Sequence, residues 1–339
     1  MRNQIVDIGA KELSYEIREI VDFAKQIEKL GQPIVWENIG DPIAKGEQVP
    51  DWIKRIVQNA ASDNFSYGYA PTKGLDETRE FLARLVNKRK KVKISKKNII
   101  FFNGVGDAIN KIYGLLKPWV RVIGPSPAYP THSSAEAAHA GAEHITYICD
   151  PGNRWYPDLD DLRMKVKYNP NISGILIINP NNPTGAVYPK KILQGIVSIA
   201  EEFGLFIIAD EIYLNVSYNG RPPIPLSDVI NNVCGIAMKG ISKELPWPGA
   251  RCGWLEAYNT SQDIVFQQYI KAIVNEKMLE VSSTTLPQKV IPEIFSDHRY
   301  RKYQHQRNEK YKKRARLAYS ILKGIKGVRV VPAEGAFYM

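Results

Sequence analysis

The sequence predicts an α/β protein whose main domain is a large, doubly wound, mostly parallel sheet of seven strands. From about residue 98, short apolar runs alternate with amphipathic runs, which is the order of a chain that passes repeatedly from strand to helix. Several apolar runs contain almost no polar residue, as expected for parallel strands buried on both faces. The expected strands cover residues 98–102, 120–124, 144–147, 175–179, 205–209, 234–238 and 251–257.

The clearest helix is expected at 189–203, between the fourth and fifth of these strands. Pro189 suits its first turn and Gly204 suits its C-terminal cap, because proline lacks an N–H and glycine tolerates a left-handed backbone. Its apolar residues recur at the i, i+3, i+4 spacing that gives a helix one buried face. They are Ile192, Leu193, Ile196, Val197 and Ala200.

Two domains are expected from the length of 339 residues and the hydrophobic content of 44%. The large domain covers 46–305, and the segments 1–45 and 306–339 together form a smaller, discontinuous α+β domain. A new strand pattern, VRVVPAEGAFYM, occurs within 327–339, and the sequence stops inside it. We therefore expect this small domain to be incomplete at its C-terminus, as in a fragment or a truncated chain.

The net charge of +11 and the pI of about 9.3 do not by themselves indicate a nucleic-acid partner. Much of the excess lies at 299–316, which we expect to be one long solvated helix. The sequence has neither an RNA-binding motif nor a metal-ligand spacing, so neither nucleic acid nor a metal is expected. It also has no signal peptide and no apolar run long enough to span a membrane. Cys149, Cys234 and Cys252 form no C-x-x-C pair, which favours free thiols in the cytoplasm.

Ligands of open α/β sheets bind beyond the carboxyl ends of the strands, so the loops there form the candidate site. NGVGD (103–107) places Gly104, Val105 and Gly106 at the start of a helix. Backbone N–H groups and the helix dipole favour a phosphate there, and a plain tight turn is the alternative. GPSPAYP (124–130) holds Tyr129 in a proline-stiffened loop that suits stacking on a flat ligand, or is simply a turn.

Three more loops carry candidate residues. In NPNNPTG (179–185), Asn182 can donate a directed hydrogen bond, although turn-forming asparagines would look the same. In DEIY (210–213), the carboxylate that ends an apolar strand needs a partner such as a protonated ring nitrogen, or else caps the next helix. The segment 240–254 places Lys243 eight residues before Arg251. Lysine forms Schiff bases, and arginine binds phosphate through a planar fork.

Together, N-P-N-N-P-T-G, D-E-x-Y and S-K-x7-R-x-G-W resemble the class I/II aminotransferases, which are pyridoxal 5′-phosphate (PLP) enzymes of fold type I in the aspartate aminotransferase superfamily. The resemblance extends from about residue 40 to the end of the sequence and implies PLP as the cofactor. It implies that Lys243 carries the cofactor as an aldimine and moves the proton between Cα and C4′. It also implies that Asp210 keeps the pyridine nitrogen protonated.

The resemblance assigns further positions around the cofactor and the substrate. Tyr69 would reach the phosphate of a neighbouring subunit, which implies a homodimer with shared active sites. Position 240, often a serine in this family, is glycine here, so that phosphate contact is absent or replaced. The remaining roles are contact with the ring oxygen for Tyr213 and Asn182, stacking for Tyr129, phosphate binding for Arg251, Ser242, Gly104, Val105 and Gly106, and substrate binding for Gly40 and Asn182.

The resemblance implies transfer of an amino group between an L-amino acid and a 2-oxo acid by a ping-pong mechanism. Dicarboxylate-specific members use an arginine in the segment corresponding to 277–288, and KMLEVSSTTLPQ contains none, which favours a neutral or aromatic donor. The family's main substrate-carboxylate arginine lies downstream of G-x-F-Y, here 335–338. If the chain ends at Met339, we expect weakened substrate binding. A PLP-dependent C–S β-lyase is the alternative, and a PLP-binding regulator or nucleic-acid-binding protein is a remote one.

Overall fold

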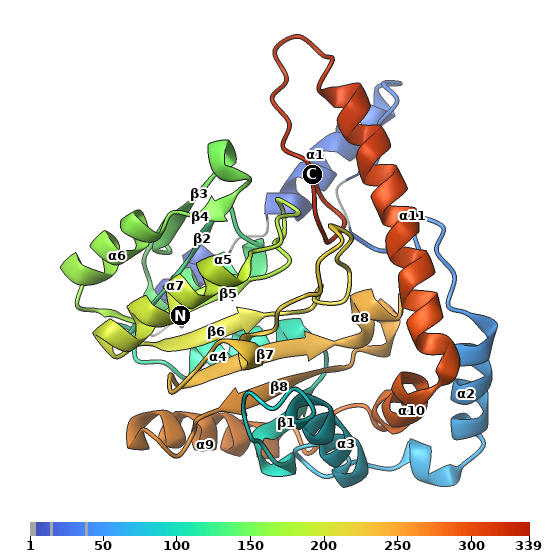
Figure 1. Cartoon of the computed structure of the whole chain (residues 1–339), viewed down its shortest axis with the longest axis vertical. Helices are drawn as coiled ribbons and strands as arrows, with labels where there is room; N and C mark the ends of the chain where they lie inside the picture. The colour runs from blue at the N-terminus through green and yellow to red at the C-terminus, as the bar shows by residue number, and fades with distance from the viewer. Residues whose placement is uncertain (1–4, 14–15, 38–39) are drawn as a thin grey trace.

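The computed structural model describes residues 5–13, 16–37 and 40–339, and its centre is one eight-stranded sheet (Figure 1). All seven expected strands are present, with ends that differ by a few residues. The eighth is an edge strand of two residues, which is too short to give a recognisable apolar pattern in the sequence. The strands are β1 (Ile99–Phe102), β2 (Arg121–Ser126), β3 (Thr146–Asp150), β4 (Tyr156–Pro157), β5 (Ile172–Ile178), β6 (Phe206–Asp210), β7 (Gly235–Gly240) and β8 (Gly253–Tyr258).

The strand order is β1-β8-β7-β6-β5-β2-β3-β4, and the five strands from β7 to β3 in this order run parallel. The antiparallel pairs are β1 with β8, β7 with β8, and β3 with β4. Gly253, at the start of β8, pairs with both Phe102 and Gly240, which end β1 and β7. The loop that precedes β8 therefore lies at the same edge as the loops that follow β1 and β7.

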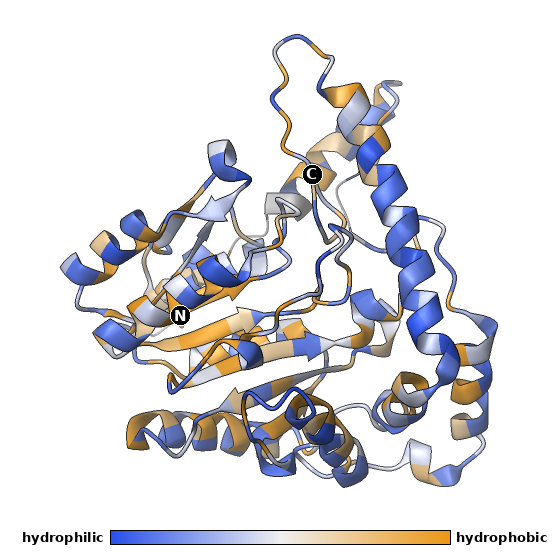
Figure 2. Cartoon of the chain, viewed as in Figure 1, coloured by the Kyte–Doolittle hydropathy of each residue, from blue (hydrophilic) through white to orange (hydrophobic). Residues whose placement is uncertain are grey.

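Helices cover both faces of the sheet, which confirms the doubly wound α/β class. Alternate strand residues point to opposite faces, so that Phe101 belongs to one buried apolar cluster and Phe102 to the other. In Figure 2 the central strands are largely hydrophobic. The first cluster includes residues of α2 (Asp51–Ala61), α3 (Asp76–Asn87), α6 (Leu159–Tyr168), α7 (Lys190–Phe203) and α10 (Thr285–Ser296), and the second includes residues of α4 (Val105–Gly114), α5 (Pro130–Ala140) and α9 (Ile264–Leu279).

The helix expected at 189–203 is α7, and its caps are Pro189 and Gly204. Pro189 takes the N-cap position, one residue before the first turn where the sequence placed it. Its extended backbone, with ψ near 159°, excludes it from the helix proper. Gly204 is the C-cap in the left-handed conformation, with φ of 68°, as expected.

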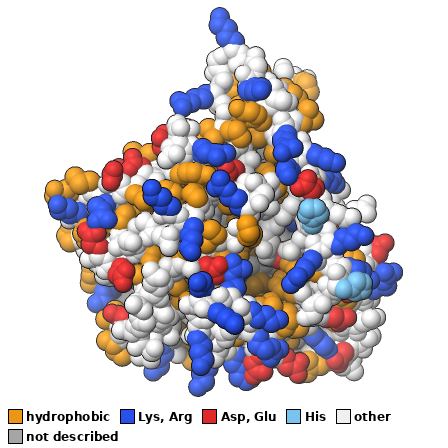
Figure 3. All heavy atoms as spheres, viewed as in Figure 1, with side chains coloured by type: hydrophobic (Ala, Val, Ile, Leu, Met, Phe, Trp, Pro, Cys, Tyr) orange, Lys and Arg blue, Asp and Glu red, His pale blue; other side chains and the backbone are white. Residues whose placement is uncertain are grey.

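The basic stretch forms part of one long helix, α11 (His298–Leu322), which is largely hydrophilic (Figure 2). This helix is continuous across residue 305, where the sequence placed a domain boundary. Arg307 is the only one of its residues that is buried. In Figure 3, Lys and Arg side chains are spread over the whole visible face, with acidic side chains between them. The remaining helices are α1 (Glu16–Lys29), α8 (Ile241–Glu244) and the 3-10 helices η1 (Ile8–Glu12), η2 (Asn64–Tyr67), η3 (Lys96–Asn98), η4 (Pro151–Asn153), η5 (Leu226–Asp228) and η6 (Pro248–Ala250).

The strand expected within 327–339 is not formed, and that expectation was wrong. This segment makes a single β-bridge, between Gly335 and Ser217. Further backbone bonds join it to the same loop, from Tyr218 N–H to Glu334 O and from Ala336 N–H to Val216 O, and to a second loop, from the N–H groups of Glu334 and Gly335 to Gly185 O. An apolar pattern becomes a strand only beside a partner strand, and here the neighbour is a loop. Of the expected small domain, residues 1–4, 14–15 and 38–39 lie outside the described part.

Two expectations about the whole chain concern membranes and thiols. Among the described residues, no helix combines the length and apolar character needed to cross a bilayer. Cys149, Cys234 and Cys252 are all free thiols, as the sequence predicts, and Cys149 and Cys252 are buried.

Candidate active site

A cavity of about 590 Å³ opens at the carboxyl edge of the sheet, where the loops after β1, β2, β5, β6 and β7 meet. Sequence reasoning placed its candidate residues in these loops, and the structure brings most of them together. Gly104, next to Val105 in the chain, and Tyr69 are not among the residues that line the cavity. The predicted residues that line the cavity are Gly40, Val105, Gly106, Tyr129, Asn182, Asp210, Tyr213, Ser242, Lys243 and Arg251.

The N-terminus of α4 and the Arg251 guanidinium form a positively charged corner of this cavity. The N-cap residue of α4, Gly104, has φ of 89° and ψ of 165°, and no side chain caps the helix. Arg251 Nη2 donates to Asn103 O at 3.4 Å, which holds the guanidinium against the same turn. Uncapped N–H groups, the helix dipole and a guanidinium together favour a bound anion.

We expect Gly104→Ala to weaken binding of a phosphate-bearing cofactor by about tenfold or more, because this backbone conformation is nearly restricted to glycine and costs roughly 1–3 kcal/mol for other residues. An added Cβ would also lie 2.7 Å from Arg251 Nη2 and push the guanidinium aside. The dissociation constant of PLP measures the effect. Gly114→Ala is the matched control, because a Cβ at that helical position meets nothing within 4 Å. Equal affinity in both variants would contradict the assignment of this corner.

Asp210 lies at the carboxyl end of β6 with its side chain 3% exposed. The Ile212 N–H donates to its Oδ1 at 3.0 Å, and His132 Nε2 lies 3.2 Å from its Oδ2. His132 is itself buried, and its Nδ1 lies 3.4 Å from the Tyr113 hydroxyl. The carboxylate is therefore fixed from behind by His132, which Tyr113 contacts in turn, while it faces the cavity.

His132 was not identified from the sequence, although one signal was available. It follows Tyr129 by three residues in the first turn of α5, so both side chains lie on one face of that helix. The rings of Tyr129 and His132 are 6.3 Å apart in an edge-to-face arrangement. No local pattern, however, connects His132 to Asp210, because the contact depends on β2, β5 and β6 lying side by side.

Lys243 lies in the short helix α8, directly after β7, with its side chain half-buried in the cavity. Its Nζ donates to Gly40 O at 2.5 Å. Burial lowers the pKa of the Lys243 amine, and Arg251 acts in the same direction, whereas Asp41 opposes the shift. A lowered pKa increases the uncharged fraction of the amine, which is the form that attacks a carbonyl carbon.

The backbone of Lys243 is held by the one buried residue of α11. Arg307 Nη1 donates to Lys243 O at 2.5 Å and to Glu244 O at 3.1 Å. Its Nε donates to Glu47 at 2.7 Å, so the guanidinium charge is paired. The sequence predicts only a solvated helix here, because Arg307 stands among many basic residues that are exposed.

Tyr213 and Tyr338 both line the cavity and meet at their hydroxyl groups. Their hydroxyl oxygens are 3.1 Å apart, and burial raises the pKa of Tyr213 well above its ordinary value. Tyr338 also lies against Gly40, since a Cβ on Gly40 would come within 2.2 Å of the Tyr338 hydroxyl. The sequence pattern did not indicate Tyr338 as a site residue, because it occurs only within the G-x-F-Y segment at 335–338.

Tyr69 does not reach the cavity of its own chain. Its side chain is 83% exposed, and it lines a separate, open depression with Trp247 and Thr285. Thr285 Oγ1 donates to Gly68 O at 2.6 Å, which ties the Tyr69 segment to the start of α10.

Glu244, next to Lys243, carries a pH-dependent part of the stability. Burial raises its pKa from 4.5 to about 7, and the hydrogen bonds from Asn215 and Gln304 only partly offset the effect. Because the folded state holds this proton more tightly, its contribution is complete below about pH 4.5 and is lost as the pH rises through about 7.

We therefore expect the free energy of unfolding of the wild type to fall between about pH 5 and about pH 7.5, by up to about 3 kcal/mol from this group. Glu244→Gln should flatten that slope, and denaturant titrations at the two pH values measure it. The exposed Glu77→Gln is the control and should leave the slope unchanged. An equal slope in Glu244→Gln and the wild type would contradict the prediction.

These residues form a site that fits PLP. The positively charged corner at Arg251 could hold a phosphate, the fixed Asp210 carboxylate suits a protonated ring nitrogen, and the half-buried Lys243 amine can react with an aldehyde. At Gly104 the Arg251 guanidinium occupies the place that a Cβ would take, so the cation packs directly against the turn. Such a site on a doubly wound sheet defines a PLP-dependent enzyme.

The chain belongs to the class I and II aminotransferases, whose family model matches residues 37–339. Members of this family use PLP. The chain is 62% identical, over its whole length and 78% of the relative, to a Methanocaldococcus jannaschii protein described as an uncharacterized aminotransferase. It is 30% identical to the glutamate-pyruvate aminotransferase AlaA of Escherichia coli K12, over 96% of this chain and 79% of that one. The alanine aminotransferase structure from Pyrococcus furiosus superposes with a TM-score of 0.89 and 28% identity, covering 98% of this chain and 82% of that one.

Proposed function

We propose that this aminotransferase moves the amino group of a small neutral L-amino acid, alanine above all, to a 2-oxo acid by a ping-pong mechanism. In the first half-reaction the donor leaves as its own 2-oxo acid, and in the reverse half-reaction a second 2-oxo acid takes up the amino group. The observation that carries the proposal is the convergence of Lys243, Asp210 and the Arg251 corner on one cavity. The name of the Escherichia coli relative, a glutamate-pyruvate aminotransferase, supports alanine and pyruvate as one substrate pair. The segment 277–288, which lacks arginine, supports a donor side chain without a carboxylate.

Each part of the cavity has a role in this proposal. The phosphate would be bound by Arg251, by the Ser242 hydroxyl and by the N–H groups that open α4. Asn182 and Tyr213 would hydrogen-bond the ring oxygen, and Tyr129 would stack on the ring. Asp210, oriented by His132, would keep the ring nitrogen protonated. Gly40 and Asn182 would bind the substrate carboxylate.

PLP supplies an aldehyde that takes up the amino group and a cationic ring that withdraws electrons from the substrate Cα. Lys243 Nζ would accept the proton from the substrate Cα and deliver it to C4′ of the cofactor, on the other side of the transferred nitrogen, which requires an amine that is uncharged before transfer. Burial and the nearby Arg251 cation favour that uncharged form. Arg307 fixes the backbone of Lys243, so only the side chain that carries the amine has to move.

The test is an absorbance scan of the purified protein with PLP, followed by addition of L-alanine, L-tyrosine or L-aspartate. We expect a visible band that L-alanine shifts to the near-ultraviolet and that 2-oxoglutarate restores. A band that responds only to L-aspartate would contradict the proposed donor class. Pyruvate release from L-cystathionine without any added oxo acid would indicate a C–S β-lyase instead.

We further infer that two copies of the chain form a homodimer in which Tyr69 contributes to the neighbour's phosphate site. Tyr69 is distant from its own cavity, and Tyr67 and Phe65 beside it are also largely exposed. Exposed aromatic side chains that cluster in this way are typical of surfaces that another molecule covers.

Mixing two inactive variants tests the shared site. Refolding or subunit exchange between Lys243→Ala and Tyr69→Ala creates mixed dimers in which one site retains both residues. We expect activity to reappear in the mixture and not in either variant alone. If Tyr69 acts within its own chain, or if the protein is a monomer, the mixture stays inactive.

A further inference from the structure

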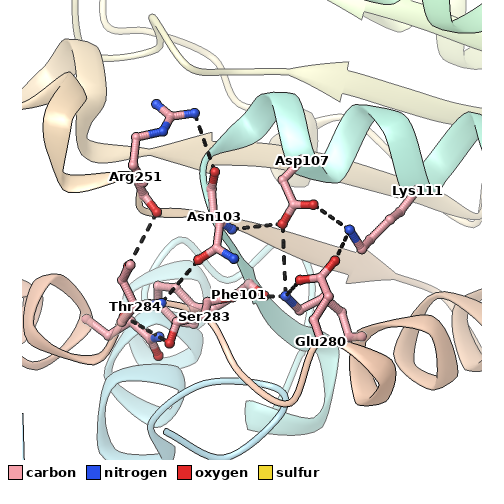
Figure 4. A network of polar contacts seen from close by, with 10 residues as sticks. Phe101, Asn103, Asp107, Lys111, Arg251, Glu280, Ser283 and Thr284 are labelled. Carbon is pink, nitrogen blue, oxygen red and sulfur yellow. Dashed lines mark hydrogen bonds and ion pairs between the residues drawn. The ribbon is translucent and has the colours of Figure 1, made fainter. Parts of the chain in front are cut away.

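Lys277, in the last turn of α9, is completely buried although its side chain is charged. Its Nζ donates to Glu280 Oε2 at 2.5 Å and to Ser283 Oγ at 3.1 Å, and it lies 3.9 Å from Asp107 Oδ2. The ammonium group also lies 5.3 Å from the centre of the Phe102 ring. Figure 4 shows the network of polar contacts around this point.

The side chains of Lys277, Glu280, Lys111 and Asp107 form a closed group of alternating charges next to the positively charged corner at the N-terminus of α4. Lys111 pairs with both Asp107 and Glu280, and Lys277 completes the group between the same two carboxylates. The formal charges cancel, and all four side chains are buried or half-buried. Burying charged groups is costly even when they are paired, and apolar residues of similar size would hold two helices together as well. The charges therefore call for a role beyond packing.

Asp107 holds the turn that begins α4, and the role of the charged group follows from this contact. Its Oδ2 accepts a hydrogen bond from Asn103 N–H at 2.9 Å, which closes the turn 103–107. Asn103 in turn accepts from two other segments, at its backbone oxygen from Arg251 Nη2 and at its Oδ1 from Thr284 N–H at 3.2 Å. As Figure 4 shows, Asn103 lies between Arg251 on one side and Asp107 on the other.

The loop that leaves α9 is fastened to the same place. Ser283 Oγ accepts from Lys277 and donates to Phe101 O at 3.0 Å, within β1. Thr284 Oγ1 lies 3.4 Å from Arg251 O, so this loop also supports the backbone of the arginine. Lys277 thus connects the α4 turn, through Asp107, with the loop that supports Arg251, beside the direct bond from Thr284 N–H to Asn103.

We propose that Lys277 is a positioning residue for the cofactor phosphate. With Asp107, Glu280 and Lys111 it fixes the α4 turn and Arg251 in the geometry that a phosphate requires. It does not touch the phosphate itself. This proposal rests on the proposed phosphate site at Gly104–Gly106 and Arg251, and it assigns a function to a charge group that lies outside the cavity.

The test compares the binding of PLP with that of pyridoxal, which lacks the phosphate, to the Lys277→Met protein. We expect the dissociation constant of PLP to rise about tenfold, the effect of losing about one net hydrogen bond, while that of pyridoxal stays unchanged. Backbone amides of 103–107 should also exchange hydrogen faster in the ligand-free variant. The matched control is Lys271→Met, on the same helix, where the lysine is exposed.

A purely structural role would give a different result, in which Lys277→Met lowers the melting temperature and changes PLP and pyridoxal affinities equally or not at all. That outcome would overturn the proposal. If Lys277→Met does not fold, Ser283→Ala tests the positioning role instead, because it keeps all four charges and removes one contact of Lys277. We expect about a threefold loss of PLP affinity from it, again without an effect on pyridoxal. If the wild type itself binds PLP no better than pyridoxal, the proposed phosphate site is wrong, and the positioning role falls with it.

Discussion

Replacing Lys243 with alanine is expected to lower the transamination rate by about 10⁴-fold, the upper end of what a positioned acid–base group contributes. The variant should still bind PLP through the phosphate corner and Asp210, because neither contact involves Lys243. It should no longer hold PLP covalently. Borohydride treatment followed by intact-mass measurement distinguishes the two states, since only the wild type should gain the mass of the cofactor.

The control for this experiment is Lys191→Ala, which removes an exposed lysine near the start of α7. It should behave as the wild type in both rate and mass. A Lys243→Ala protein that retains the covalently bound cofactor would show that another amine carries PLP. The half-buried amine of Lys243 and its lowered pKa make it the best-placed candidate among the residues that line the cavity.

Replacing Asp210 with asparagine is expected to lower kcat by about 10³-fold, in the range seen when one preorganised electrostatic partner is removed. Asparagine has nearly the same shape, so it can keep the 3.0 Å bond from Ile212 N–H, but it provides no negative charge for a protonated ring nitrogen. Affinity for PLP should change much less than kcat. Steady-state kinetics with L-alanine and 2-oxoglutarate, together with a PLP titration, separate the two effects.

Asp51→Asn, on the exposed start of α2, is the control for loss of a carboxylate and should be silent. A parallel fall in PLP affinity and kcat for Asp210→Asn would indicate that Asp210 mainly shapes the cavity. His132→Phe provides a further comparison. It removes the group behind Asp210 without changing the carboxylate, so we expect a smaller loss of kcat in the same direction.

Much of the fold could be predicted from the sequence because its signals are local. The strands β5 and β6 are short runs of apolar residues, and α7 has a clear apolar stripe with Gly204 at its end. The loops that carry Asn182, Asp210 and Lys243 directly follow strands, and parallel strands bring their carboxyl ends to one edge. Sequence order and strand direction are therefore enough to place these side chains near one another.

The tertiary structure alone decided the partners of the buried polar groups. His132 meets Asp210 across 78 residues only because β5 lies between β2 and β6, and Lys277 meets Asp107 only because α9 packs beside α4. The segment 327–339 shows the reverse case, because its apolar pattern suits a strand but its neighbour is a loop. Hydrophobic periodicity determines which face of an element is buried, whereas the partner of a buried charge depends on which elements the strand order places side by side.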